Sequence, residues 1–428
     1  MQYHLEKTRI FDPELYNLIK NEEDRQEHTL ELIASESIQS PQLLEINGCA
    51  FNNKTAVGKP GDMHLLGSHF ADDLIKLTAR RACELYGAEH ANVQVYSGST
   101  ANYAVYAACL KVGDRVLAMS PHQGGHATHG SSANIVSQIY QFTHYGVDPC
   151  SQLIDYDKME EMAMQIKPKL IIAGGSTYSQ YFDYSRIAEI AHKVGAYFLV
   201  DMAHYTGLIA AGLIPSPVPY ADFVTGSTTK TICGPRSGFI LCKQQYADMI
   251  DEGAYPRVVA SLHLQTMAAM AHAFEYAKSD EFHEVMQATL DNARTLCEEL
   301  RKRDFNIVSG STRCHLMVVD MRNRGIDGKS FAKILESINL SVNAVDIPYD
   351  TSPVRSGVRI GTTVVSQRGM SAPEMVRIAD IIEDVSRHPY DRETLEQNRR
   401  KVRELCDEFP LYGRFDRLER ERSKVDAI

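Results

Sequence analysis

Three short stretches of the sequence combine residue types that could do chemistry together. In the first, Ser97, Gly98 and Ser99 precede a segment with helical spacing. Small residues at such a place let backbone N–H groups and hydroxyls approach a phosphate, and the N-terminus of a helix favours its negative charge. Because Ser-Gly-Ser is also an ordinary capped turn, this stretch by itself is weak evidence for a phosphate site.

The second stretch places an acid at the end of a strongly apolar run. Asp201 follows the run from Tyr197 to Val200, and His204 lies three residues further on. A carboxylate at this place is costly unless it has a cationic or proton-donating partner, and a protonated pyridine nitrogen is such a partner. The alternative interpretation is that Asp201 caps the N-terminus of a helix.

The third stretch places Thr228 and Thr229 directly before Lys230. The hydroxyls could bind a phosphate and the amine could condense with an aldehyde, although a solvated loop lysine is far commoner. A phosphate turn, a strand-end acid and a lysine in one region together predict pyridoxal 5'-phosphate, bound to Lys230 as a Schiff base. With Asp201 keeping the ring nitrogen protonated, that cofactor would stabilise a carbanion at the α-carbon of an amino acid.

These stretches lie in a region, from residue 75 to residue 245, where helical patterns alternate with short apolar runs. The runs are rich in β-forming residues and flanked by Gly, Asp or Pro, as buried parallel strands are. We therefore predict an α/β domain with a mostly parallel sheet, in which ligands bind at the carboxyl ends of the strands. The predicted strands begin at Val116, Leu170, Tyr197 and Phe239, and the predicted helices run from Ala101 to Leu110 and from Ser185 to Val194.

After residue 278 the pattern changes to that of an α+β domain. A long amphipathic helix is predicted from Glu281 to Arg303, followed by apolar runs at 316–320 and 358–361 and a helix from Pro373 to Arg387. We predict three parts: an N-terminal helical arm over residues 1–30, a large cofactor-binding domain over 31–278 and a small C-terminal domain over 279–428.

Composition excludes several classes of protein. The 428 residues are 44% hydrophobic and 23% charged, a globular balance, and a net charge of -10 without a basic cluster argues against nucleic-acid binding. No apolar run approaches the roughly 18 residues that span a bilayer, and the start lacks a secretory segment, so we expect a cytoplasmic protein without a membrane partner. His122, His126 and His129 have no carboxylate or cysteine at a suitable spacing, so no metal site is predicted.

Longer motifs surround the chemical residues. They include Glu31-Leu-Ile-Ala-Ser-Glu36, Gly124-Gly-His126-Ala-Thr-His129-Gly, Val200-Asp-Met-Ala-His204 and Ser356-Gly-Val-Arg-Ile-Gly-Thr362. In these collinear motifs the sequence resembles the serine hydroxymethyltransferase family over almost its whole length. The resemblance implies the type I aminotransferase-like pyridoxal-phosphate fold, with a mostly parallel seven-stranded sheet domain and a smaller C-terminal α+β domain. It also implies a homodimer, or a dimer of dimers, whose active sites are shared between subunits.

The resemblance also implies roles for individual residues. Arg359 and Ser35 would bind the α-carboxylate of a small amino-acid substrate, a task for which the forked guanidinium is suited. His126 would stack on the cofactor ring, and Ser176 would hydrogen-bond on the side of its phenolic oxygen. The remaining cofactor-binding residues would be Ser97, Gly98 and Ser99 at the phosphate, Asp201 at the pyridinium with His204 beside it, and Thr228 and Lys230 at the Schiff base.

Departures from the family pattern gather in one segment. The family has tyrosine and glutamate where this sequence has Thr55 and Val57, and a second tyrosine where it has Leu65. The glutamate handles protons and contacts folate during one-carbon transfer, and valine can neither accept nor donate a proton. His64 is the titratable newcomer in this segment, and an imidazole suits acid–base catalysis near neutral pH.

Because Asp201, His126, Lys230 and Arg359 remain while the folate side has changed, altered substrate chemistry is favoured over loss of function. We predict a folate-independent aldolase or transaldolase, which makes or breaks a carbon–carbon bond at the α-carbon of glycine, serine or threonine with an aldehyde. One alternative is a tetrahydrofolate-dependent serine (glycine) hydroxymethyltransferase. The other is a non-catalytic paralogue that binds pyridoxal 5'-phosphate.

Overall fold

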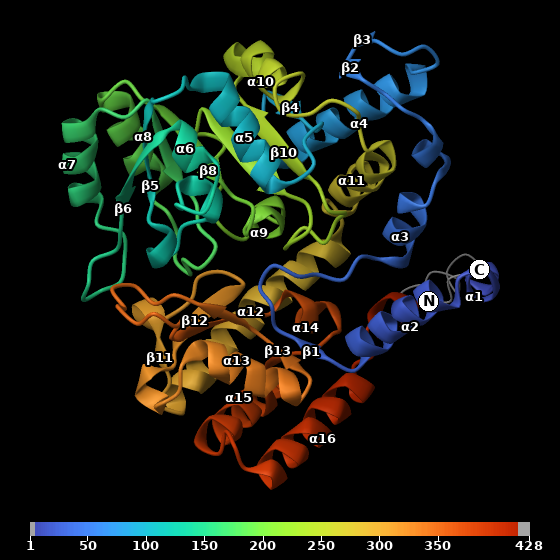
Figure 1. The fold of residues 1–428 in the computed structure, drawn as a ribbon, viewed down its shortest axis with the longest axis vertical. Coiled ribbons are helices and arrows are strands. Elements are labelled where there is room, and N and C mark those ends of the chain that lie inside the picture. The colour runs from blue at the N-terminus through green and yellow to red at the C-terminus, as the bar shows by residue number, and fades with distance from the viewer. Residues whose placement is uncertain (1–4, 418–428) are drawn as a thin grey trace.

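A seven-stranded sheet forms the centre of the upper part of the molecule in Figure 1, a computed structural model that describes residues 5–417. The strand order is β4-β10-β9-β8-β7-β5-β6. All neighbours from β9 to β6 are parallel, whereas β10 is antiparallel to both β9 and β4. The predicted mostly parallel sheet is therefore confirmed. Its strands are β4 (His90–Asn92), β5 (Arg115–Met119), β6 (Gln141–Tyr145), β7 (Leu170–Ala173), β8 (Tyr197–Asp201), β9 (Phe223–Ser227) and β10 (Gly238–Cys242).

Side chains along the central strands alternate between two hydrophobic cores, one on each face of this sheet. In β5, Leu117 and Met119 lie in one core, and Val116 and Ala118 lie in the other. Because helices cover both faces of the sheet, the side chains on both faces of each central strand are apolar, and the sequence of the strand is a continuous apolar run rather than an alternating one. The first core includes residues of α4 (His69–Tyr86), α8 (Tyr184–Lys193) and α11 (Leu264–Tyr276), and the second includes residues of α5 (Gly98–Cys109) and α10 (Ala247–Ala254).

Shorter elements complete this part of the chain. A two-stranded hairpin formed by β2 and β3 projects at its edge (Figure 1). Its exposed position means that the segment around it is available to a neighbouring molecule. The shorter elements are α3 (Pro41–Asn47), β2 (Gly58–Lys59), β3 (Asp62–Met63), α6 (Val136–Ile139), α7 (Tyr156–Ile166) and α9 (Thr206–Ala210).

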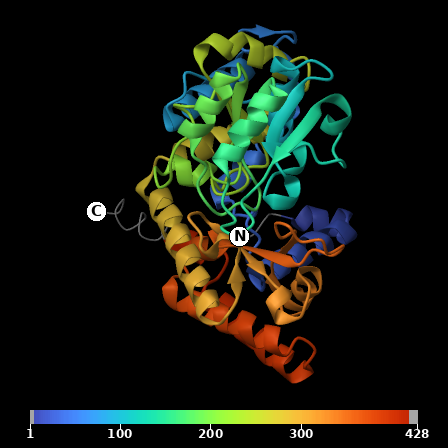
Figure 2. The ribbon, with the colours of Figure 1, turned by 90° about the vertical axis from the view of Figure 1, so that its left-hand side faces the viewer.

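A four-stranded antiparallel sheet, in the order β11-β12-β15-β14, lies below the seven-stranded one in Figures 1 and 2. Its own hydrophobic core is separate from the two cores above. The predicted α+β character of this region is thus present. Its elements are α12 (Asp280–Lys302), β11 (Asn306–Ile307), β12 (Leu316–Asp320), α13 (Gly328–Ser337), β13 (Leu340–Ser341), β14 (Asn343–Val345), β15 (Gly357–Gly361), α14 (Thr363–Gln367), α15 (Ala372–Arg387) and α16 (Arg392–Glu408).

The N-terminal segment packs with this lower part. It consists of α1 (Glu6–Phe11), α2 (Pro13–Glu27) and β1 (Leu30–Glu31), and β1 pairs in parallel with β13. Leu30 and Leu32 are fully buried in the core of the four-stranded sheet. The boundaries at residues 30 and 278 stay predictions, but residues 30–32 are packed into the core of the residues after 300.

Arg368 joins the two ends of the chain. It is buried, and its guanidinium donates hydrogen bonds to the carbonyl oxygens of Glu27 and Thr29 at 3.0 and 3.2 Å and of Cys406 and Phe409 at 3.0 and 2.6 Å. These carbonyls lie at or just beyond the C-terminal ends of α2 and α16, where helices leave carbonyl groups unpaired and favour a cation. One side chain therefore caps two helices that are far apart in the sequence.

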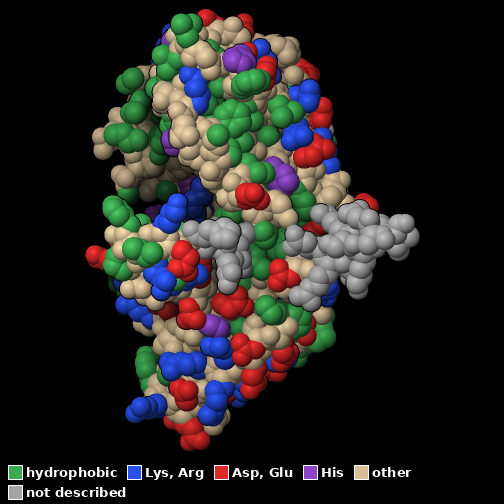
Figure 3. Space-filling model, turned by 90° about the vertical axis from the view of Figure 1, so that its right-hand side faces the viewer, with side chains coloured by type: hydrophobic (Ala, Val, Ile, Leu, Met, Phe, Trp, Pro, Cys, Tyr) green, Lys and Arg blue, Asp and Glu red, His purple; other side chains and the backbone are tan. Residues whose placement is uncertain are grey.

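The surface shown in Figure 3 carries acidic and basic side chains interspersed, and it is hollowed between the two sheet units. Basic and histidine side chains lie at the edge of this hollow. Among the helices of residues 5–417, none combines the length and apolar character that crossing a membrane requires.

Candidate active site

The carboxyl ends of β8 and β9 and the N-terminus of α5 surround a cavity of about 170 Å³. Asp201 ends β8, Ser227 ends β9 and Gly98 begins α5. In a parallel sheet this edge is where ligands bind. The cavity is lined by Ser97, Gly98, Ser99, His126, Gly175, Asp201, Ala203, His204, Ser227 and Lys230.

A capping box fixes the start of α5 at one side of the cavity. Ser97 Oγ accepts a hydrogen bond from the Thr100 N–H at 3.1 Å, and Thr100 Oγ1 accepts one from the Ser97 N–H at 2.8 Å. The first N–H groups of a helix lack partners within the helix, and the helix dipole favours an anion beside them. With Lys230 in the same cavity, this side suits a phosphate.

Asp201 is buried, and both of its carboxylate oxygens are held. Oδ2 accepts hydrogen bonds from Asn102 Nδ2 at 2.8 Å and from His129 Nε2 at 3.1 Å, and Oδ1 accepts one from the Ala203 N–H at 3.0 Å. Burial acts to raise the pKa of Asp201, but the hydrogen bond from His129 and the nearby positive charges outweigh burial and hold the pKa well below its usual range. The carboxylate is therefore ionised, as a partner of a protonated pyridine nitrogen must be.

Lys230 lies in a tightly bonded turn after β9. The Gly234 N–H donates to the Thr228 carbonyl at 2.7 Å, and the Thr228 N–H donates to the Ser237 carbonyl at 3.1 Å. Burial lowers the pKa of Lys230 to about 8, Asp201 opposes that change, and Arg359 adds to it. A lowered pKa leaves a useful fraction of neutral amine near neutral pH, which an amine nucleophile requires.

Arg359 lies in the four-stranded sheet, and its charged guanidinium contacts the loop that follows β7 of the seven-stranded sheet. It lies within β15, is buried, and donates from Nη1 to the Ser176 carbonyl, beyond the end of β7, at 2.7 Å. Burial lowers its pKa to about 10, so the guanidinium stays charged at neutral pH. The Ser176 hydroxyl donates to the Gly125 carbonyl at 3.1 Å.

Two histidines of the cavity are neutral. Burial, followed by the charge of His129, lowers the pKa of His126 to about 4, and its Nδ1 lies 2.7 Å from Thr128 Oγ1. Burial also holds the pKa of His204 well below its usual range, and the nearby charges of Lys230 and Arg359 add to the effect. Both rings can therefore lie against a ligand without adding charge.

Unpaired buried atoms at this site indicate a polar ligand. Within residues 5–417, His204 Nδ1 and Arg359 Nε are buried without a hydrogen-bond partner. Buried polar atoms are nearly always paired, so atoms left over beside a cavity call for a molecule that can bind there. A helix N-terminus, an ionised Asp201 and the amine of Lys230 together fit a phosphorylated pyridine aldehyde.

Five of the residues expected at the site do not line this cavity, namely Ser35, His64, Ser176, Thr228 and Arg359. Arg359 and Ser176 are bonded to each other beside it, as described above. The Thr228 hydroxyl donates to the Pro235 carbonyl, and Ser227 lines the cavity instead, because the side chains at a strand end alternate in direction. His64 is exposed after β3, with its Nδ1 3.1 Å from the Tyr255 hydroxyl. Ser35 lines a neighbouring cavity.

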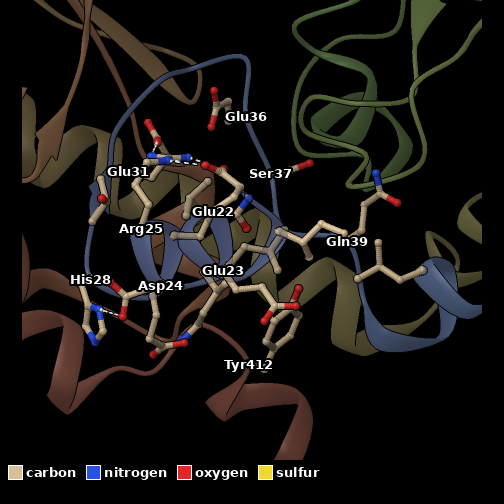
Figure 4. A pocket seen from close by; sticks show the side chains of 18 of the residues that line it. Glu22, Glu23, Asp24, Arg25, His28, Glu31, Glu36, Ser37, Gln39 and Tyr412 are labelled. Carbon is tan, nitrogen blue, oxygen red and sulfur yellow. Dashed lines mark hydrogen bonds and ion pairs between the residues drawn. The ribbon is translucent and has the colours of Figure 1, made fainter. Parts of the chain in front are cut away.

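That neighbouring cavity, of about 980 Å³, lies between α2 and the loop over residues 35–39 (Figure 4). Thr229, which directly precedes Lys230, also lines it. Figure 4 shows acidic side chains along α2 and the loop, with Arg25 directed toward Glu31. Burial, followed by the charge of Glu36, raises the pKa of Glu31 to about 7.

The sequence predicts no metal site because no carboxylate or cysteine stands near the three histidines. The structure does place a carboxylate beside two of them. His126, His129 and Asp201 have nitrogen and carboxylate oxygen atoms within 4.8 Å of one another. The carboxylate was missed because it comes from the end of β8, 72 residues after His129. The hydrogen bond between His129 and Asp201 gives the cluster a simpler use, which is to hold the carboxylate.

Sequence reasoning assigned no role to two residues that hold Asp201. Asn102 lies one turn into α5, and the Thr225 hydroxyl donates to its Oδ1 at 2.6 Å, which leaves Nδ2 free to donate to Asp201. His129 lies in the motif from Gly124 to Gly130, and its three-residue distance from His126 is the signal that the sequence offers for it.

A family model described as serine hydroxymethyltransferase matches residues 8–382. The match runs from α1 into α15 and so includes the whole cavity wall as well as Arg359 and Ser35. The fold, with its mostly parallel seven-stranded sheet, agrees with the type I pyridoxal-phosphate fold expected for these enzymes. The chain belongs to the serine hydroxymethyltransferase family, whose members are transferases that depend on pyridoxal 5'-phosphate.

Proposed function

We propose that this member of the family is a folate-independent aldolase or transaldolase, which acts on glycine, serine or threonine together with an aldehyde. One observation carries the proposal. Lys230, Asp201 and Arg359 keep the groups needed for cofactor and carboxylate binding, whereas Val57 stands where the family has its folate-side glutamate. Random loss of function should have changed residues on the cofactor side as well, which favours altered substrate chemistry.

The smaller cavity is the proposed cofactor site. Lys230 Nζ would bond the aldehyde carbon, Asp201 would hold the proton on the ring nitrogen, and residues 97–99 would bind the phosphate at the start of α5. The neutral ring of His126 would lie against the pyridine. When bound, pyridoxal 5'-phosphate withdraws electron density from the α-carbon of an attached amino acid.

We assign Arg359 and Ser35 to the α-carboxylate of the substrate. A guanidinium can form two parallel hydrogen bonds with a carboxylate, and Arg359 Nε is unpaired within the described chain. A fixed carboxylate determines which bond at the α-carbon is held in a reactive orientation. We keep His204 as a candidate catalytic residue beside the cofactor ring, where its buried Nδ1 lacks a partner within residues 5–417 and can bond a ligand.

The side chain of Val57 supports independence from folate. Val57 is half-buried just before β2, and its carbonyl accepts a hydrogen bond from the His64 N–H at 2.9 Å. An isopropyl group cannot move a proton, and a positioned acid–base group is typically worth about 10²–10⁴-fold in rate. The backbone of His64 is bonded to Val57, and we include the His64 imidazole as a candidate acid–base residue.

A homodimer, or a dimer of dimers, is part of the proposal. His64 does not line the cavity of its own chain, as far as residues 5–417 describe it. The same segment exposes Leu66 at 95% and Phe70 at 67%. Exposed apolar side chains that lie together on one surface are typical of an interface with another protein. We propose that a second copy covers this surface and that His64 then acts at the site of the partner.

Product analysis tests the function. The purified protein with its cofactor is incubated with glycine, serine or threonine, with and without tetrahydrofolate, and with a panel of aldehydes. We expect cleavage or exchange of a β-hydroxy amino acid at a rate that tetrahydrofolate does not change. Rapid conversion of serine to glycine that needs tetrahydrofolate and is abolished in His64→Ala would show a relocated base and refute folate independence.

A spectral titration separates an enzyme from a non-catalytic paralogue. We expect glycine to change the visible absorbance of the bound cofactor, because Arg359 and Lys230 would both contact the amino acid. A cofactor absorbance that no amino acid alters, in protein that retains its cofactor, would assign the chain to the non-catalytic class.

A further inference from the structure

His315 lies outside the proposed site, yet it connects two parts of that site. It directly precedes β12 (Leu316–Asp320), is fully buried, and places its ring 5.7 Å from that of His204, with an angle of 20° between the two planes. Its Nε2 lies 3.1 Å from the Ala34 carbonyl oxygen. Ala34 directly precedes Ser35, the proposed contact of the substrate carboxylate.

The direction of the hydrogen bond to Ala34 follows from its acceptor. A carbonyl oxygen can only accept, so His315 Nε2 must carry the proton. Burial lowers the pKa of His315 to about 3, so the ring is neutral and its Nδ1 carries no proton. This Nδ1 is buried and unpaired within residues 5–417, which leaves the bond to Ala34 as the fixed polar contact of the ring.

The carbonyl that His315 holds belongs to a tight turn. The Glu36 N–H donates to the Ile33 carbonyl at 3.0 Å, so Ala34 and Ser35 are the two central residues of that turn. The Ala34 carbonyl and the Ser35 N–H belong to one planar peptide group. Holding the oxygen of this group therefore sets the direction from which the Ser35 side chain departs.

The rest of the segment is tied down on both sides. Before the turn, the Gly361 N–H donates to the Leu32 carbonyl at 2.7 Å, and a β-carbon at Gly361 would lie 2.4 Å from the α-carbon of Ala34. After the turn, Ser37 Oγ donates to the Thr229 carbonyl at 2.8 Å, next to Lys230. The turn is thus held between β15 and the lysine loop, and His315 is the side chain that orients its central peptide.

We propose that His315 is a positioning residue, which orients the Ala34–Ser35 peptide so that the Ser35 hydroxyl meets the carboxylate of the amino-acid substrate. This inference rests on the role proposed above for Ser35. It assigns to His315 no contact with substrate or cofactor. Loss of the Nε2 donor should therefore weaken binding of the amino acid without removing the cofactor.

A double-mutant cycle tests the inference. Glycine affinity is measured by titration of cofactor-loaded protein for His315→Phe, which keeps an aromatic ring but no donor, and for His315→Gln, whose amide can reach the position of Nε2. We expect about 3- to 10-fold weaker glycine binding for His315→Phe, the usual effect of one hydrogen bond, and less than about twofold for His315→Gln. In a Ser35→Ala background, His315→Phe should have no further effect, because residues that act through each other are not additive.

Cofactor content and melting temperature are measured for each variant, and His192→Phe on the exposed face of α8 serves as the matched control. If His315→Phe does not fold, His315→Asn, whose amide is too short to reach the carbonyl, takes its place in the cycle. Equal losses with and without Ser35, or loss of cofactor in place of glycine affinity, would overturn the inference. An unchanged glycine affinity in Ser35→Ala alone would remove the role of Ser35 and this inference with it, while the folate and aldehyde assays would still decide the proposed function separately.

Discussion

The cavity must hold Lys230 as a neutral amine and Asp201 as an ionised carboxylate. The amine must lose its proton to react, whereas the carboxylate must stay ionised, and each charge affects the other. Burial favours the neutral amine, and the charge of Asp201 limits how far the pKa of Lys230 falls. Three hydrogen bonds, from Asn102, His129 and the Ala203 N–H, keep the carboxylate ionised in spite of its burial.

A pH dependence of cofactor capture follows from the pKa of Lys230, which burial lowers to about 8. When pyridoxal 5'-phosphate is added to cofactor-free protein, the rate of covalent capture should rise about tenfold per pH unit below pH 8 and level off above it, since the neutral amine reacts. In Asp201→Asn the inflection should move to lower pH, because the Asp201 charge raises the pKa of Lys230. Borohydride reduction and peptide mapping locate the modified lysine.

In that experiment Lys230→Arg is the control and should yield no labelled peptide. An inflection near the ordinary lysine value, or a pyridoxyl group on another lysine, would contradict the proposed role of Lys230.

Arg359→Lys should weaken glycine binding about 10- to 100-fold while cofactor content stays the same. A lysine ammonium cannot reproduce the parallel pair of hydrogen bonds, and a hydrogen bond to a charged group contributes about 1.5–3 kcal/mol. Spectral titration with glycine measures the effect, and Arg403→Lys on the exposed face of α16 is the matched control. Unchanged glycine affinity would place the carboxylate elsewhere.

At the residue scale, sequence could predict the side chains that short motifs mark but not those that support them. Asp201 and Lys230 stand at strand ends, where position along the chain reveals position in the fold. Asn102 and His315 carry no such mark. Asn102 acts on Asp201, 99 positions away, and His315 acts on Ala34, 281 positions away. These pairs become neighbours only when the chain folds.

At the element scale, the long buried elements agreed closely with their predicted spans. The helix predicted from Glu281 to Arg303 is α12 (Asp280–Lys302), and the run beginning at Leu170 is β7. These elements bury one or two continuous apolar faces, which a periodic pattern reveals. β1 and β13 have two residues each, too few for any period, so their pairing could not be predicted.

Glu31, in β1, makes the stability of this segment depend on pH. Its pKa is raised from 4.5 to about 7, so between these values the folded protein holds a proton that the unfolded chain has lost. The free energy of unfolding should therefore fall as pH rises from 4.5 to 7. Glu31→Gln cannot lose this proton and should be more stable than the parent by about 1–3 kcal/mol at pH 8, with little difference at pH 4.5.

Urea denaturation at the two pH values measures the Glu31 effect. Glu396→Gln, an exposed glutamate of α16, is the control and should change stability by less than about 0.5 kcal/mol at both. A parent and a Glu31→Gln variant with the same pH dependence would show that Glu31 is ionised in the folded protein.

At the scale of the whole molecule, we expect replacement of Arg368 to lower the free energy of unfolding more than replacement of any other single basic residue outside the active site. Arg368→Met would keep most of the side-chain volume but leave the carbonyls of Thr29, Cys406 and Phe409 without their donor. We expect a loss of about 2–5 kcal/mol in the free energy of unfolding, because several buried acceptors lose a charged partner together.

Limited proteolysis provides the spatial readout for Arg368→Met. New cleavage should appear near the C-terminal ends of both α2 and α16, since one guanidinium caps both helices. Arg403→Met, in α16 but exposed, should show neither effect. Cleavage at only one of the two ends would show that the other is held independently.

The parallel pairing of Leu30 with Leu340 has a consequence for synthesis on the ribosome. At about 5–20 residues per second, on the order of 15–60 s separates the appearance of Leu30 from that of its partner. During this interval Leu30 lacks its strand partner, and the turn that carries Ser35 lacks Gly361 throughout and His315 until shortly before the end. The segment around Leu30 is therefore among the last to fold, although it is made about 310 residues before its partner, and nascent chains that end before residue 340 should expose it to chaperones.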